Sequence, residues 1–259
     1  MKPSLFVSSA LLALSALMAT GCSGAAEPQE PKVLRAISSQ GVEVVDEFPA
    51  GAGAGVRAYA GSASGNPLAI YVLNDGTAIV GTRIGSDGKV LDQDTLTRLV
   101  AEPAAKSTMA KLEQSSWIQD GSKTAPKVIY VFTDANCPYC HQFWQATRPW
   151  VDAGKVQLRH IMVGVIREDS AGKAAFIMSA QDPAAAFRQN ESAGPRGSAK
   201  ALASIPPRIK QELALNEQLM TSLGFQGTPA IISLVPGGGL QKINGMPRGD
   251  ALAGLLGPR

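Results

Sequence analysis

Residues 128–141 read Val-Ile-Tyr-Val-Phe-Thr-Asp-Ala-Asn-Cys-Pro-Tyr-Cys-His, and this stretch decides the fold. Its first five residues are apolar without polar alternation, which predicts a strand buried on both faces of a sheet. The run breaks at Asp134. Asn136 is a suitable N-cap and Pro138 fits a first helical turn, so we expect a helix to begin at about Cys137. Strand, turn and helix then place two cysteines at a helix N-terminus.

The cysteines Cys137 and Cys140 have the spacing of a redox-active dithiol. A thiolate carries out disulfide exchange, and the unpaired N–H groups and the dipole at a helix N-terminus stabilise a negative sulfur. We expect Cys137 to be the exposed nucleophile with the low pKa, and Cys140, one turn further and more buried, to resolve the mixed disulfide. A charged His141 would also favour a thiolate and raise the redox potential; the alternative is a solvated surface histidine.

Three other interpretations of Cys-x-x-Cys are open. A zinc site needs two further ligands, yet outside the motif the only Cys and His residues are Cys22 and His160. A structural disulfide across so short a loop would constrain the unfolded chain little. Covalent c-type haem attachment is also satisfied by residues 137–141, with Met246 as a conceivable distal ligand, but the surrounding sequence argues against it. We therefore expect no metal and no cofactor.

The N-terminus has the pattern of an export signal. Met1-Lys2 precede an apolar run over residues 5–18, too short to span a membrane, so we expect a signal peptide over residues 1–22 and a mature protein outside the cytoplasm. Residues 19–22 resemble a lipobox, in which Cys22 would be lipidated and anchor the protein to a membrane. The alternative is an ordinary signal peptide with a stray cysteine. Residues 23–31 predict a disordered leader.

Composition indicates a soluble globular protein. The chain is 45% hydrophobic and 17% charged with a net charge of +3, and its charges are not clustered, so nothing indicates nucleic-acid binding. A mature chain of about 235 residues suggests two domains. Exported proteins often use several disulfides to stabilise their fold. A mature chain with only one closely spaced cysteine pair therefore indicates that the pair serves chemistry and not stability.

The first predicted domain, residues 32–93, carries strand signals throughout. Asn74-Asp75-Gly76 and Ser86-Asp87-Gly88 are hairpin turns, and residues 51–55 predict a flexible loop. Such a small antiparallel sheet would be marginally stable alone and has strand edges that a partner subunit could cover. Within residues 94–118, apolar side chains recur at helical spacing, which predicts a linker helix with a break near Pro103.

The second predicted domain, residues 119–259, contains the cysteines. A second buried strand over residues 156–165 completes a right-handed strand-helix-strand unit, with His160 expected on its polar face. Residues 168–223 predict a helical insertion. Thr228-Pro229, with a cis proline, then opens a strand, and a further strand and a short helix follow at residues 240–243 and 250–256.

The segment Phe132-Thr133-Asp134, the Cys-Pro-Tyr-Cys pair and Thr228-Pro229 together resemble the DsbC and DsbG family of thiol:disulfide interchange proteins. Residues 116–118, 143–144, 148–152 and 154–158 resemble the DsbG branch in particular, whereas His141 departs toward DsbC. Val131 stands where thioredoxin has a buried acid, as in this family. The resemblance implies a thioredoxin-like domain with a helical insertion, preceded by a cystatin-like antiparallel sheet for dimerisation and a linker helix, in a mixed α+β and α/β fold.

The same resemblance implies a V-shaped periplasmic homodimer whose cleft accepts unfolded or oxidised proteins. Its thiols would be kept reduced by a membrane thiol reductant of the DsbD type. Cys137 would reshuffle client disulfides or reduce sulfenic acids on single cysteines, while Pro138, Tyr139, Thr228 and Pro229 would bind the client or tune the pair. A holdase chaperone without redox chemistry is an alternative use of the cleft.

Overall fold

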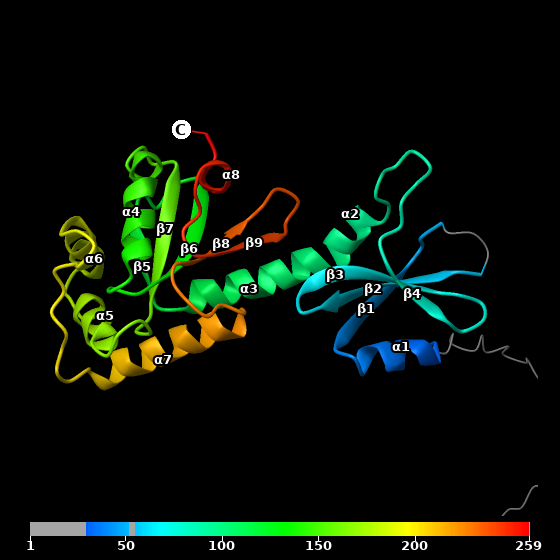
Figure 1. Ribbon diagram of the computed structural model, residues 1–259, viewed down its shortest axis with the longest axis horizontal. Coiled ribbons are helices and arrows are strands. Elements are labelled where there is room, and N and C mark those ends of the chain that lie inside the picture. The colour runs from blue at the N-terminus through cyan, green and yellow to red at the C-terminus, as the bar shows by residue number, and fades with distance from the viewer. Residues whose placement is uncertain (1–29, 52–54, 259) are drawn as a thin grey trace, which may run out of the picture.

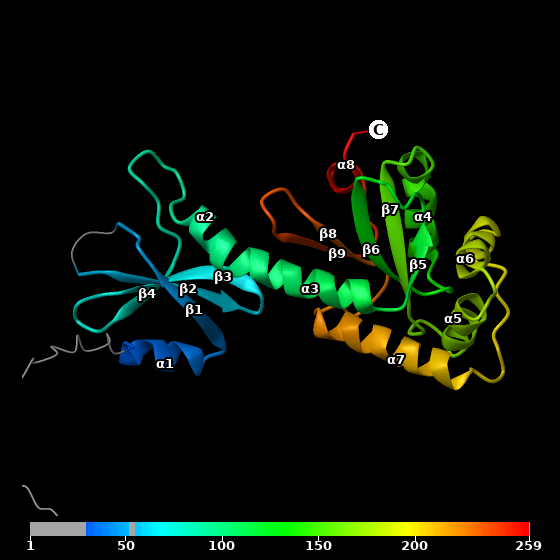
Figure 2. The same ribbon diagram turned by 180° about the vertical axis from the view of Figure 1, so that it is seen from behind.

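The computed structural model describes residues 30–51 and 55–258. The expected signal peptide, Cys22, most of the leader and the middle of the glycine-rich loop lie outside the described residues. Figures 1 and 2 show two separate bodies, each built on one sheet, joined by a long helical segment. The cysteine motif belongs to the C-terminal body.

The N-terminal body is a four-stranded antiparallel sheet in the order β1-β2-β3-β4, packed against one short helix. Its elements are α1 (Lys32–Ser38), β1 (Val42–Phe48), β2 (Arg57–Ala63), β3 (Asn66–Val72) and β4 (Ala78–Gly81). The expectation of strands alone was wrong at α1, which buries Leu34 against Tyr59 and Ile70. After β4, the turn at residues 86–88 is closed by a single bridge between Ile84 and Val90.

The connecting segment is one continuous helical rod made of α2 (Gln93–Leu96), a π-helical turn η1 (Thr97–Ala101) and α3 (Glu102–Gln114). The expected break near Pro103 is instead the π-turn directly before it, and Pro103 lies in the first turn of α3, where its missing N–H costs little. Trp117 was expected in this helix but opens a strand.

The C-terminal body has a five-stranded sheet in the order β5-β7-β6-β8-β9, in which only the central pair β6 and β7 is parallel. The strands are β5 (Trp117–Asp120), β6 (Lys127–Thr133), β7 (Val156–Met162), β8 (Ala230–Leu234) and β9 (Leu240–Asn244). The helices are α4 (Pro138–Val151), α5 (Ser170–Met178), α6 (Pro183–Ser192), α7 (Pro207–Ser222) and α8 (Asp250–Leu256).

Helices cover both faces of this sheet, which explains the uninterrupted apolar run of β6. Ile129 and Val131 pack against α4 and α8, while Tyr130 and Phe132 pack against α3 and α7. The insertion helices α5 and α6 form a third cluster against the β5 and β7 side. Leu112 of α3 is fully buried among residues of the C-terminal body, so α3 belongs to that core as well as to the linker.

A hydrocarbon bilayer could not be crossed by any helix within the described residues, because none combines the required length with sufficient hydropathy.

Candidate active site

The two cysteines lie at the junction between β6 and α4. Cys137, rather than the expected Asn136, is the N-cap of α4, with extended backbone angles and a sulfur that accepts a hydrogen bond from the Cys140 N–H at 3.2 Å. The Asn136 side chain is engaged elsewhere, since its amide donates to Asp169 and Ser170. The free N–H groups at the start of the helix would therefore stabilise a thiolate at Cys137.

The environments of the two thiols separate their pKa values. A hydrogen bond from the Cys140 thiol outweighs burial and lowers the pKa of Cys137 to about 7, with smaller contributions from Thr228 and nearby backbone N–H groups. Burial, followed by the hydrogen bond and charge of Cys137, raises the pKa of Cys140 well above its ordinary value. This is the order expected for a nucleophile and a resolving thiol.

The exposure of the thiols differs from expectation. Cys137 was expected to be exposed and Cys140 more buried, but only 4% of Cys137 and 3% of Cys140 is accessible, and both are free thiols. Burial is nevertheless the largest effect on the pKa of Cys140, whereas at Cys137 the hydrogen bond from the Cys140 thiol outweighs it. A reagent would have to approach the protein closely before it met the Cys137 sulfur.

The segment before β8 faces the cysteines, and its Thr228-Pro229 bond is cis as predicted. The Cys137 thiol donates to the Thr228 carbonyl oxygen at 3.3 Å. The buried Thr228 hydroxyl lowers the pKa of both thiols but makes no hydrogen bond of ordinary length. Tyr139, by contrast, projects from the motif into solvent. Residues from two distant parts of the chain thus meet at one sulfur.

The chain resembles known proteins over nearly its whole length. Residues 118–257 match the family model of the thioredoxin-like domain. The chain is 44% identical to the thiol:disulfide interchange protein DsbG of Pseudomonas aeruginosa over 94% of each chain. The chain belongs to the DsbG family.

A second relative agrees with this assignment, and a solved structure shares the fold of the C-terminal body. DsbG of Escherichia coli is 37% identical over 88% of this chain and 91% of its own. The catalytic domain of ScsC from Proteus mirabilis, 21% identical, shares the fold with a TM-score of 0.50 over 60% of this chain and 96% of its own. This DsbG-family protein is a periplasmic thiol-disulfide oxidoreductase with a thioredoxin-like domain.

His141 does not lie on the surface of this DsbG-family protein. It is buried, its Nδ1 lies 3.3 Å from Glu191 Oε2, and its ring stacks on Trp144. Burial raises the pKa of Glu191, which comes from helix α6 of the insertion. The solvated alternative is therefore wrong, and the direct partner of His141 is a carboxyl group rather than a thiol. Nothing in the sequence near His141 indicated this partner, fifty residues away.

His160 was expected on a polar strand face but is buried. Its Nδ1 lies 3.0 Å from the Thr133 hydroxyl, and its ring packs on Phe187, contributed by the insertion. Its Nε2 lies 3.5 Å from Asp120 Oδ2. The insertion helix α6 covers this strand, so the face that alternation suggested as wet is an interior one. In the described part of the chain, no three His, Cys, Asp or Glu side chains are grouped to hold a metal ion.

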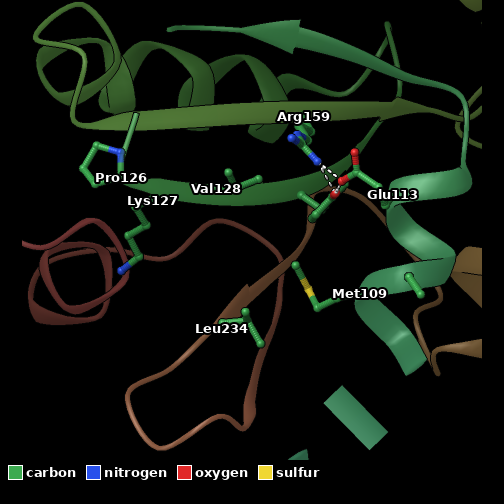
Figure 3. A pocket seen from close by; sticks show the side chains of 9 residues that line it. Met109, Glu113, Pro126, Lys127, Val128, Arg159 and Leu234 are labelled. Carbon is green, nitrogen blue, oxygen red and sulfur yellow. Dashed lines mark hydrogen bonds and ion pairs between the residues drawn. The ribbon is translucent and has the colours of Figure 1, made fainter. Parts of the chain in front are cut away.

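A cavity of about 550 Å³ lies at the other end of β6, between α3 and the sheet (Figure 3). Glu113 of α3 accepts a hydrogen bond from the Tyr130 hydroxyl at 2.5 Å and pairs with Arg159, whose guanidinium also stacks on Trp117. Met109 and Leu234 line its apolar side. This cavity is remote from the cysteines, and its polar contacts fasten the linker helix to the catalytic sheet.

Proposed function

We propose that Cys137 is the attacking thiolate and Cys140 the resolving thiol of a disulfide isomerase and reductase for exported proteins. The observation that carries this proposal is the Cys137 sulfur at the N-cap of α4, with the Cys140 N–H directed at it. The thiolate attacks one sulfur of a client disulfide, the client S–S bond breaks, and its other sulfur leaves as a thiolate that takes up a proton.

Two outcomes follow from the mixed disulfide. If another client thiol attacks it, Cys137 is released unchanged and the client has been isomerised. If Cys140 loses its proton and attacks the Cys137 sulfur, the client leaves with two thiols and the enzyme keeps the disulfide. The two electrons are then restored by a thiol reductant, for which we propose a membrane protein of the DsbD type.

A sulfenic acid on a single client cysteine fits the same centre. The Cys137 thiolate attacks the sulfenic sulfur, hydroxide leaves and is protonated to water, and the resulting mixed disulfide is resolved by Cys140. Pro138, Tyr139, Thr228 and Pro229 surround the reacting sulfur and are proposed to hold the client chain. His141 is proposed to tune the redox pair through Glu191 and the position of α4.

The titration of Cys137 tests the assignment of roles. Because the thiolate is the nucleophile and the pKa of Cys137 is lowered to about 7, the rate of exchange with a small disulfide should rise with pH and level off above about pH 8. Thiolate absorbance of the Cys140→Ser variant should show one transition near neutral pH, and that of Cys137→Ser one at much higher pH. Equal transitions near pH 8.5, the ordinary value of a free cysteine, would overturn the assignment.

The N-terminal sheet is proposed to make the protein a homodimer. Its edge strands β1 and β4 present exposed apolar side chains at Val45, Ile79 and Val80. An unpaired edge of this kind is suited to pairing with a symmetric copy. The sheet contributes no cysteine, so its effect on the reaction is geometric: it fixes two catalytic domains around unfolded or oxidised clients. Lipid anchoring at Cys22 is a separate proposal, which mass measurement of the mature N-terminus tests.

A chain that begins at Glu102 tests the role of the dimer. A start at Gln119, the expected domain boundary, would remove half of β5 and the buried Leu112, so α3 has to be retained. Sedimentation should show a folded monomer. It should exchange disulfides with glutathione at the full-length rate but lose most isomerase activity on a scrambled protein. A monomeric full-length protein, or full isomerase activity in the shortened chain, would contradict this role.

A further inference from the structure

The carboxylate of Asp134 ties the cysteine turn to the loop that follows β7. Asp134 is only 1% exposed, and its Oδ1 accepts hydrogen bonds from the Asn136 N–H at 2.8 Å and the Ser170 hydroxyl at 2.9 Å. Its Oδ2 accepts from the N–H groups of Val165 at 2.8 Å and Ile166 at 2.9 Å. A buried carboxylate with four donors has little freedom left, so the elements it joins are held in a fixed relation.

The loop after β7 is anchored at every successive N–H. Val163 donates to the Thr133 carbonyl at 3.0 Å, Gly164 to Glu217 at 3.0 Å, and the next two residues to Asp134. A Cβ at Gly164 would come within 2.6 Å of the Ala171 backbone, so the loop is pressed against α5. This is a rigid segment rather than a mobile one.

The same anchoring exposes two neighbouring apolar side chains. Because the N–H groups of Val165 and Ile166 point inward to Asp134, their side chains face solvent, and 44% of each is accessible. Isolated exposed aliphatic residues are common, but a rigid loop that holds two β-branched residues outward side by side is not explained by the packing of the domain. We call Val165 and Ile166 the ledge.

The ledge and the cysteine turn are held by the same residue, Asp134. Cys137 donates its N–H to the Asp134 carbonyl at 3.0 Å, so a single residue contacts both the nucleophile's backbone and the ledge. The start of α5, which follows the ledge in the chain, makes polar contacts with the same turn, since Lys173 donates to the Asn136 side chain at 2.8 Å and pairs with Asp169 at 3.0 Å. An apolar contact flanked by charged groups is the arrangement of a protein-binding surface.

We propose that the ledge docks an apolar side chain of the client that lies close in sequence to its oxidised cysteine, and that Asp134 is the positioning residue that holds the ledge out. A client is the fitting occupant because Asp134 joins the ledge to the turn at which a client sulfur must meet the almost buried Cys137. A second copy of the chain seated there would close that approach. This inference rests on the proposed role of Cys137.

The test uses the full-length Val165→Ser, Ile166→Ser double variant and two disulfide-bonded peptides that differ only in leucine or serine beside the cysteine. For the leucine peptide, KM should rise about tenfold with kcat unchanged, because burial of two aliphatic groups is lost. Reaction with the serine peptide and with glutathione disulfide should be unaffected. Leu215→Ser on α7, which removes a side chain that is 55% exposed far from the site, is the matched control and should change nothing.

An equal change in KM for both peptides, or no change for either, would show that the ledge does not dock the client side chain. Failure of the proposed function is a distinct result, because wild-type protein would then fail to react even with glutathione disulfide. Asp134→Asn tests the positioning role: it should reproduce the leucine-peptide effect and also shift the pH profile of exchange. Asp120→Asn, at an equally buried aspartate, should lower stability without moving that profile; identical profiles for both variants would show that Asp134 is merely structural.

Discussion

Replacing Cys137 by serine should slow thiol-disulfide exchange by more than about 10³-fold with every substrate, because a hydroxyl at neutral pH is a far weaker nucleophile than a thiolate. The sulfur occupies the N-cap and interacts with both Cys140 and Thr228, so no neighbouring group can replace it. Consumption of glutathione disulfide by reduced protein is the measurement. Circular dichroism provides the control that the variant is folded.

The Cys140→Ser variant should behave differently. The first attack remains possible, but resolution does not, so a covalent mixed disulfide with the client should accumulate on non-reducing gels. Accumulation on Cys137→Ser instead would reverse the proposed roles. A variant that lacks both thiols separates redox chemistry from chaperone action, since only the holdase interpretation allows it to prevent aggregation of an unfolded client.

Asp120→Asn should lower the free energy of unfolding by about 3 kcal/mol at pH 7, because it leaves Arg148 without its buried partner. Asp120 Oδ1 and Oδ2 accept from Arg148 at 3.1 and 2.5 Å, which fastens β5 to the helix that carries the cysteines. Burial alone would raise the pKa of Asp120, but His160 and Arg148 together outweigh it and lower the pKa to about 2.

The sign of the pH dependence follows from this lowered pKa. A carboxyl group that is more acidic in the folded state contributes stability above its unfolded pKa, and the contribution disappears as the pH falls through the folded value. The gap between wild type and Asp120→Asn, measured by urea unfolding, should therefore shrink between about pH 4 and pH 2. Asp152→Asn is the control: this carboxylate also pairs with Arg148, but at 3.8 Å and 72% exposed. A gap independent of pH, or an equal effect of Asp152→Asn, would contradict the assignment.

Local patterns predicted the parts of this structure that local forces determine. The apolar run of β6, the helix after it and the proline at the start of β8 all follow from neighbouring residues. The seven-residue helix α1 was missed because its Val33, Leu34 and Ile37 are equally compatible with a strand, and only packing on the sheet selects the helix.

The surroundings of the cysteines could not be predicted in the same way. Glu191 reaches His141 from the insertion, and Ser170 reaches Asp134 across 36 residues. Such contacts depend on how distant elements pack, which no periodicity encodes. One signal was available: Asp134 follows a buried strand immediately before the motif, and a carboxylate there has to find donors. The sequence therefore pointed to the two cysteines but not to the groups that surround them.

The π-helical turn at residues 97–101 gives the rod between the two sheets one place where its length can change with little change of direction. A turn of this type accommodates one more residue than the α-helical turn it replaces. Deleting that residue would therefore make the rod continuously α-helical while the helical phase on either side stays nearly the same. A residue deleted from the α-helical part of the rod would instead rotate everything beyond it by about 100° and shift it by about 1.5 Å. In the proposed dimer, the relative direction of the two Cys137 sulfurs would thus tolerate a deletion in the π-turn and change with a deletion in α3.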